Sequence, residues 1–206
     1  MFYKKKKEPT RDQLIERSFG HKDNQSTDIL FLFPPTSIGK DYSHRYGKKD
    51  LGELKGDLIP LGIASLAAYL RKYKFCVAAL DCIALELSHK EIVEIIRRKK
   101  PRSIGISATT YALPASSTLA DRLRKEFPNL LIILGGAHAN VAGTHAARTI
   151  NSIDIISYHP EGETVILEIL KKFSNHDFNR MSFLNDIDVM KSIKGIIFKN
   201  RKEIIK

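Results

Sequence analysis

At 206 residues, with 43% hydrophobic and 28% charged residues, the chain has the length and composition of one globular α/β domain with extensions. The formal net charge of +11 favours an anionic partner, but no nucleic-acid motif accompanies the basic residues, so we do not expect nucleic acid to bind. No apolar run reaches about 18 residues and none follows the N-terminal lysines, so we expect a cytoplasmic protein with neither a membrane span nor a secretory signal.

The first 27 residues are polar and charged, and we expect them to form a basic, partly flexible arm. Within this arm, three apolar residues are spaced as in a short docking helix: Leu14, Ile15 and Phe19. Asp28–Phe33 is predicted as the first strand, because it is a short apolar run that ends at two prolines. The loop that follows, residues 36–59, is of a length that is usually either functional or disordered.

Strands and helices then alternate to about residue 173. The later strands are predicted at Phe75–Leu80, Ser103–Ala108, Leu130–Leu134 and Ile153–Ser157. The helices are predicted from Pro60, from Ser88 to Lys100, at Pro114–Phe127, at Ala142–Ile150, and from the region of Gly162 to Phe173. Leu130–Leu134 shows no polar alternation, which is typical of a strand buried on both faces. The pattern predicts a doubly wound, five-stranded parallel sheet of flavodoxin or Rossmann type.

The last part of the chain differs from this α/β core. Residues 174–190 are polar and predicted to be irregular, and Ile193–Phe198 and Glu203–Ile205 are predicted to pair as a β-hairpin around Asn200-Arg201. We therefore divide the chain into the arm at 1–27, an α/β domain at 28–175, and a linker with a C-terminal hairpin at 176–206.

The predicted ligand site is the sheet edge at which the parallel strands end, because ligands of open α/β sheets bind there. Gly135 and Gly136 end the fourth strand, where glycine lets the backbone come close to a large ligand. Small hydroxyl residues lie around the carboxyl end of the third strand, at Ser107, Thr109 and Thr110, and serve either as ligand donors or as turn and capping residues.

The usual nucleotide motifs do not explain this edge. A dinucleotide site requires Gly-x-Gly-x-x-Gly after the first strand, where this chain has Pro34 and Pro35 instead, and no Walker A motif occurs. Glu161 and Glu163 flank Gly162 at the start of the last helix, where acidic residues also favourably oppose the helix dipole.

Six segments in the right order resemble the cobalamin-binding domain of B12-dependent radical S-adenosylmethionine proteins. They are PLGIASLAAYLRKY (60–73), ALDC (79–82), IGISATT (104–110), FPNLLIILGGAHAN (127–140), EGE (161–163) and IKGIIFKNRKEII (193–205). The resemblance implies a corrin ring over the carboxyl ends of the strands, and a nucleotide tail beside the sheet. The cofactor-binding residues it suggests are Pro35, Ser107, Thr109, Thr110, Gly135, Gly136, His138, Glu161 and Gly162.

The chain departs from this class in two motifs. Thr109 stands where the Ser-x-Leu motif of the wider class has leucine. The class also carries Asp-x-His-x-x-Gly, whose histidine binds cobalt. Here Asp41 lies one residue too far from His44 to fix its tautomer, so we expect His44 to be a loop residue and predict no metal ligand.

Catalysis by the resembled class needs Cys-x-x-x-Cys-x-x-Cys to hold a [4Fe–4S] cluster. The chain has only Cys76 and Cys82, so we expect no iron–sulfur cluster and no catalysis by this chain alone. The expectation is a cobalamin-binding domain without its radical barrel, which a separately encoded subunit could supply. The alternatives left open are a flavodoxin-like protein with another cofactor and a degenerate α/β module for protein interaction.

Overall fold

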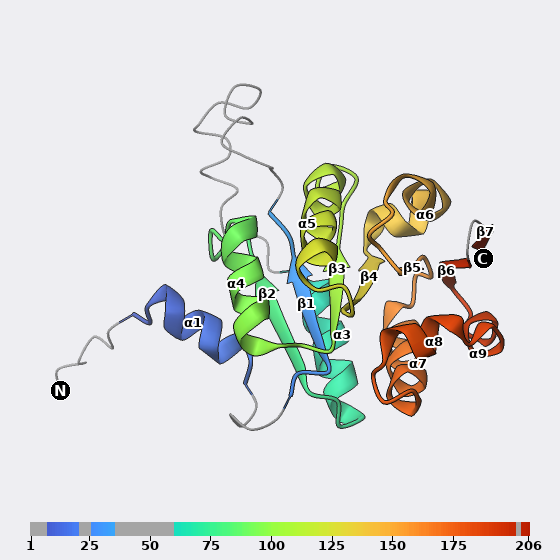
Figure 1. Ribbon diagram of the computed structural model, residues 1–206. Coiled ribbons are helices and arrows are strands. Elements are labelled where there is room, and N and C mark those ends of the chain that lie inside the picture. The colour runs from blue at the N-terminus through green and yellow to red at the C-terminus, as the bar shows by residue number, and fades with distance from the viewer. Residues whose placement is uncertain (1–7, 21–25, 36–59, 201–202) are drawn as a thin grey trace, which may run out of the picture.

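The computed structural model describes residues 8–20, 26–35, 60–200 and 203–206 (Figure 1). Within these ranges, seven strands form one sheet in the order β2-β1-β3-β4-β5-β6-β7. The pairs from β2 to β5 are parallel, and β6 and β7 are added antiparallel. The strands are β1 Ile29–Phe33, β2 Val77–Asp81, β3 Ser103–Ser107, β4 Leu131–Gly135, β5 Ile155–Ser157, β6 Ile196–Asn200 and β7 Glu203–Ile205.

The doubly wound α/β fold predicted from the sequence is confirmed. All five predicted parallel strands are present, and the predicted hairpin forms β6 and β7. The hairpin does not stand apart from the core, because Ile156 of β5 pairs with Ile197 of β6 and the sheet continues to β7. The turn residue Arg201 lies outside the described residues.

Helices cover both faces of the sheet (Figure 1). They are α1 Arg11–Ser18, α3 Leu61–Lys72, α4 His89–Lys99, α5 Leu113–Glu126, α6 Ala137–Thr149, α7 Gly162–Asn175, α8 Arg180–Asn185 and α9 Ile187–Ser192. One face packs under α1, α4, α5 and α6, and the other under α3, α7, α8 and α9. Successive strand residues point to opposite faces, so each strand contributes to both cores.

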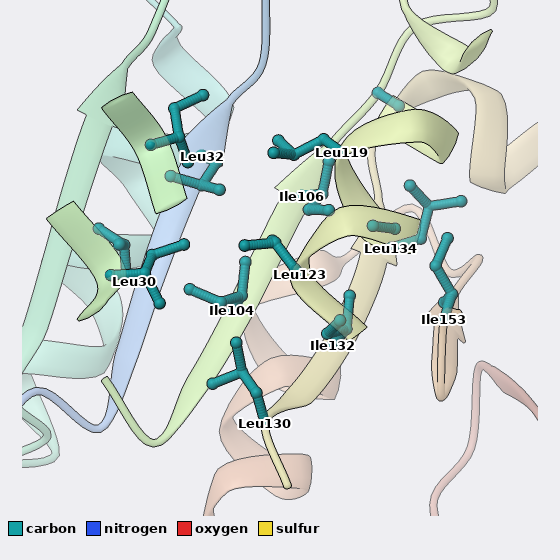
Figure 2. Close-up of a cluster of buried hydrophobic side chains, with 14 of the residues drawn as sticks. Leu30, Leu32, Ile104, Ile106, Leu119, Leu123, Leu130, Ile132, Leu134 and Ile153 are labelled. Carbon is teal, nitrogen blue, oxygen red and sulfur yellow. The ribbon is translucent and has the colours of Figure 1, made fainter. Parts of the chain in front are cut away.

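The core between the sheet and α5 is built from aliphatic side chains (Figure 2). Leu30 and Leu32 of β1 and Ile104 and Ile106 of β3 lie on one face of the sheet, where α5 packs over them with Leu119 and Leu123. All six of these side chains are at most 1% exposed. On the opposite face, a Cβ at Gly105 would lie 2.6 Å from Cδ1 of Phe31, so only glycine leaves room for that ring.

The structure differs from the sequence prediction in two helical regions. Helix α6 begins at Ala137, five residues earlier than predicted, and bends at Ala142, whose φ and ψ of −132° and 29° are not helical. The prediction of irregular structure at 174–190 was wrong. Helices α8 and α9 form there, and the side chains of Asn179 and Asp186 accept hydrogen bonds from their first turns. Asn and Asp are common both at helix N-termini and in loops, so their presence in the sequence does not distinguish a helix start from irregular structure.

Residues 11–18 of the basic arm form the docked helix α1. Thr10 begins it with a capping box, and Ile15 and Phe19 are each only 4% exposed. Ion pairs join it to α4, with Arg11 to Glu91 and Glu16 to both Arg98 and Lys99. Exposed ion pairs contribute little individually, so the two buried apolar side chains supply most of the docking energy.

The helices of the described residues include none with the length and apolar character of a membrane span.

Candidate functional site

The strands β1 and β3 are neighbours in the sheet, and the order in which the chain adds strands reverses between them. From β1 the connection leads to β2 on one side, whereas β3, β4 and β5 follow on the other. Such a topological switch point leaves a crevice outside the carboxyl ends of the strands. Pro35, which is half-buried, follows β1 at this point. Ser107 is the last residue of β3, and Thr109 and Thr110 follow it.

Gly136 allows β3 and β4 to approach closely at this edge. Its φ of +93° and ψ of −176° lie in a region that is essentially restricted to glycine. A Cβ there would lie 2.8 Å from both the backbone N and O of Ala108 and 3.0 Å from Oγ of Ser107. The Ala108 N–H also donates to the Gly135 carbonyl at 3.0 Å. Gly136 is therefore required by backbone packing within the protein.

Gly135 has a different environment. It pairs with Ser107 in the β3–β4 register, yet a Cβ at position 135 would meet no atom of the described residues within 4 Å. The space beside the end of β4 is therefore open, next to the half-buried Ser107. The sequence pattern predicts one shared role for the two glycines, whereas in the structure Gly136 is required by backbone packing and Gly135 borders open space.

His138 lies against the turn that follows β3. Its backbone N–H donates to the Ala108 carbonyl at 3.1 Å, and its ring Nδ1 lies 3.1 Å from Oγ1 of Thr110. The residue is 5% exposed, and its buried Nε2 has no hydrogen-bond partner in the described part of the chain. Burial, and secondly the neighbouring His145, lower the pKa of His138. The imidazole therefore joins α6 to the β3 turn as a neutral ring.

The two threonines after β3 are exposed and have different partners. The Thr109 hydroxyl accepts from the Ala112 N–H at 3.2 Å and so caps the turn before α5. The Thr110 hydroxyl pairs with His138. The turn-forming role considered for these hydroxyls thus exists in the structure, and each oxygen retains further hydrogen-bonding capacity.

Glu161 and Gly162 lie at the start of α7, on the side of the sheet covered by α3. A Cβ at Gly162 would lie 3.6 Å from Cδ2 of Leu66, and Glu163 accepts a 2.6 Å hydrogen bond from the Ser65 hydroxyl. Glu161 is exposed. Ser65 and Glu163 thus link α3 to α7. Among the described residues, no hydrogen bond joins Glu161, Gly162 or Glu163 to Gly136 or His138.

Three exposed apolar residues that sequence reasoning missed border this edge, and together we call them the apolar rim. Leu61 begins α3 and is 73% exposed, Tyr111 follows β3 and is 42% exposed, and Val141 lies at the bend of α6 and is 88% exposed. Their residue types carry no signal in the sequence, because only the fold brings a strand end and two helix starts to one edge.

Metal-binding candidates are limited in the described ranges. Across residues 8–20, 26–35, 60–200 and 203–206, no group of three His, Cys, Asp or Glu side chains could hold a metal ion. Cys76 and Cys82 are free and buried, and burial raises the pKa of both thiols, so they remain protonated at neutral pH. His44 and Asp41, the weak cobalt-site candidates, lie outside the described residues.

Two buried imidazoles make stability sensitive to acid. Burial lowers the pKa of His89 and of His138 below their ordinary value of 6.5, with Arg122 adding to the effect at His89. As the pH falls through 6.5, the unfolded chain binds protons before the folded chain does, so the free energy of unfolding should decrease until the folded-state pKa values are passed. Urea unfolding at pH 7.5, 6.5 and 5.5 measures this slope. His89→Gln should reduce it, and an unchanged slope in that variant would exclude the role of His89.

Comparison with known proteins agrees with this architecture. The family described as the B12 binding domain matches residues 47–169, which is more than half of the chain and includes β2 to β5. An uncharacterized methyltransferase from Pyrococcus horikoshii is 30% identical over 115 residues, covering 56% of this chain and 25% of that protein.

Two further relatives are named anaerobic magnesium-protoporphyrin IX monomethyl ester cyclase. The protein from Synechocystis is 30% identical over 153 residues, covering 73% of this chain and 28% of its own length. The protein from Cereibacter sphaeroides is 25% identical over 158 residues, covering 74% of this chain and 24% of its own. The chain thus spans about a quarter of the length of these relatives. The family match confirms the resemblance found in the sequence motifs, and the chain belongs to the B12-binding domain family.

Proposed function

We propose that this chain binds cobalamin, with the corrin ring over the carboxyl ends of β1, β3 and β4. The observation that carries the proposal is the open space beside Gly135, at the switch point of a domain of the B12-binding family. A flat, bulky cofactor fits this edge, because Gly136 lets the backbones of β3 and β4 pack closely and Gly135 leaves space for a ligand beside them. When bound, cobalamin supplies a cobalt centre for methyl-transfer or radical chemistry, and the residues of this chain bind and orient it.

The polar groups of this edge suit the periphery of the cofactor. Ser107, Thr109 and Thr110 present hydroxyls that can donate to amide carbonyl and phosphate oxygens. Pro35 borders the same edge after β1, and Glu161 and Gly162 border it at the start of α7. Positions on three strand ends and one helix start surround a broad ligand better than a single loop would.

The apolar rim suits the ring itself. Of the six large apolar side chains that are exposed in the described residues, three lie at the carboxyl edge: Leu61, Tyr111 and Val141. The others are Leu14 of α1, Tyr73 at the end of α3, and Met181, the second residue of α8, which lies at the opposite edge. Covering such side chains with an apolar ring releases water and favours binding by about 25 cal/mol per Å². The rim therefore accounts for ring affinity independently of the hydroxyls.

Titration with hydroxocobalamin, followed by its visible absorption, tests the proposal. Wild-type chain should retain cobalamin on gel filtration and shift its spectrum. The triple variant Leu61→Ser, Tyr111→Ser, Val141→Ser should bind at least about tenfold more weakly, because it loses apolar contact without disturbing buried residues.

Met181→Ser is the matched control, since it removes an exposed apolar side chain from the far edge and should leave the affinity unchanged. Absence of any spectral shift with wild-type chain would refute cobalamin binding, and would favour the protein-interaction module. If wild type and triple variant bind with equal affinity, cobalamin binding stands, but the apolar rim does not contribute to it.

The reaction to which cobalamin contributes is a further part of the proposal. The relatives are about four times as long as the part this chain matches, so we assign the reaction to a radical barrel outside the described residues, for which this chain holds the cofactor. Co-purification of a tagged chain with a protein that carries Cys-x-x-x-Cys-x-x-Cys would support a separately encoded barrel.

A further inference from the structure

The contact between His138 and Thr110 determines where the imidazole proton lies. Nδ1 of His138 is 3.1 Å from Oγ1 of Thr110, and Nε2 is buried with no partner among residues 8–20, 26–35, 60–200 and 203–206. A neutral imidazole carries one proton, on either nitrogen. A proton on Nε2 would leave a buried N–H donor without an acceptor, whereas a proton on Nδ1 leaves only an acceptor lone pair unpaired. Orphaned buried N–H groups are the rarer of the two, so the proton belongs on Nδ1.

This tautomer fixes the direction of the threonine hydroxyl. With Nδ1–H as donor, Oγ1 of Thr110 accepts, and the threonine O–H remains available to donate elsewhere. Thr110 is exposed, whereas His138 behind it is 5% exposed. The available donor therefore points away from the buried ring, toward the carboxyl edge of the sheet. The backbone N–H of His138 donates to the Ala108 carbonyl at 3.1 Å and so fixes the backbone that carries the ring.

We infer that His138 is a positioning residue, which orients the Thr110 O–H so that it donates to an acceptor oxygen of the bound corrinoid. The inference rests on the proposed cobalamin binding and deepens it, since it names the hydrogen-bond donor, the Thr110 O–H, and the group that orients this donor, Nδ1–H of His138. The acceptor is either an amide carbonyl of the corrin periphery or the phosphate of the nucleotide tail, because both present oxygen lone pairs. His138 itself makes no contact with the ligand.

The tautomer can be tested without any ligand. A long-range ¹H–¹⁵N spectrum of the wild-type chain, with His138→Asn as the assignment control, should show a protonated Nδ1 and an unprotonated Nε2 at neutral pH. A proton on Nε2 would overturn the inference, because Thr110 would then donate to the imidazole and have no proton left for a ligand. This outcome would leave cobalamin binding untouched.

Titration of variants with hydroxocobalamin tests the coupling to the ligand. Thr110→Val should weaken binding about tenfold by removing one hydrogen bond, and Thr110→Ser should stay within about twofold of wild type. His138→Leu keeps the threonine but no longer orients it, and should weaken binding about fivefold. His138→Asn keeps a donor near the position of Nδ1 and should restore most of the affinity.

Two comparisons separate positioning from a general structural role. The double variant Thr110→Val, His138→Leu should bind no more weakly than Thr110→Val alone, because both changes remove one interaction. Thr149→Val, at the far end of α6, should bind as wild type does. Wild-type affinity in His138→Leu, or additive losses in the double variant, would contradict the inference. Lack of binding by the wild type would instead refute the proposed function.

Cobinamide, which lacks the nucleotide tail, identifies the acceptor. If Thr110→Val weakens cobinamide and cobalamin by the same factor, the hydroxyl donates to a ring amide. If only cobalamin is weakened, the hydroxyl donates to the phosphate. Equal binding of cobinamide and cobalamin by Thr110→Val and wild type would overturn the inference.

Discussion

Gly136→Ala should unfold the chain more readily and abolish cobalamin binding. The new Cβ would lie 2.8 Å from the N and O atoms of Ala108, in a backbone conformation with φ of +93°. Strain in a glycine-only region and overpacking of a close backbone contact each cost about 1–3 kcal/mol, so we expect a loss of about 3 kcal/mol or more in the free energy of unfolding. Urea denaturation followed by circular dichroism measures this loss.

Gly135→Ala is the matched control, because it adds the same methyl group one residue earlier. A Cβ at position 135 would meet no atom within 4 Å in the part of the chain that the structure describes, so the free energy of unfolding should change by less than about 1 kcal/mol. The larger change Gly135→Leu should also leave a folded domain, but fill the open space and weaken hydroxocobalamin binding. Similar destabilisation by the two alanine variants would contradict the separate roles of the glycines.

Asp154→Ala should produce the other large loss of stability. The carboxylate is 5% exposed and accepts from Arg124 Nη2 at 2.6 Å, from Arg180 Nη2 at 2.6 Å and from the Ile132 N–H at 2.9 Å. Its removal leaves two arginines, each about a fifth exposed, without their counter-charge. Breaking a buried pair in this way costs about 3–5 kcal/mol. Thermal and urea unfolding of the variant measure the effect.

Asp154→Asn separates charge from shape at this position. The amide keeps the size of the side chain and one acceptor oxygen but carries no charge, so its loss should be intermediate between wild type and alanine. Asp154 precedes β5 at the amino edge of the sheet, so either variant should bind hydroxocobalamin normally at a temperature at which it is folded. A loss below about 1 kcal/mol in Asp154→Ala would show that the arginines find other partners.

Local sequence patterns were sufficient to predict the order of the strands and helices of the α/β core. Apolar runs such as Leu130–Leu134 and the capping box at Ser88 and Glu91 specify strand and helix through interactions within a few residues, and the structure has them where predicted. The start of α6 and helices α8 and α9 were not predicted. A bend at Ala142 and polar N-caps depend on what packs against them, and this information does not lie in the local sequence.

The sequence by itself determined the doubly wound fold, the family and the strand ends at which the candidate site lies, because hydrophobic periodicity and short motifs encode them locally. Only the tertiary structure decided how these residues divide their roles. It placed Gly136 against Ala108, left space beside Gly135 and turned His138 toward Thr110. It also brought Leu61, Tyr111 and Val141 to one edge. Such differences arise from contacts between segments far apart in the chain, and these contacts exist only once the strands have paired.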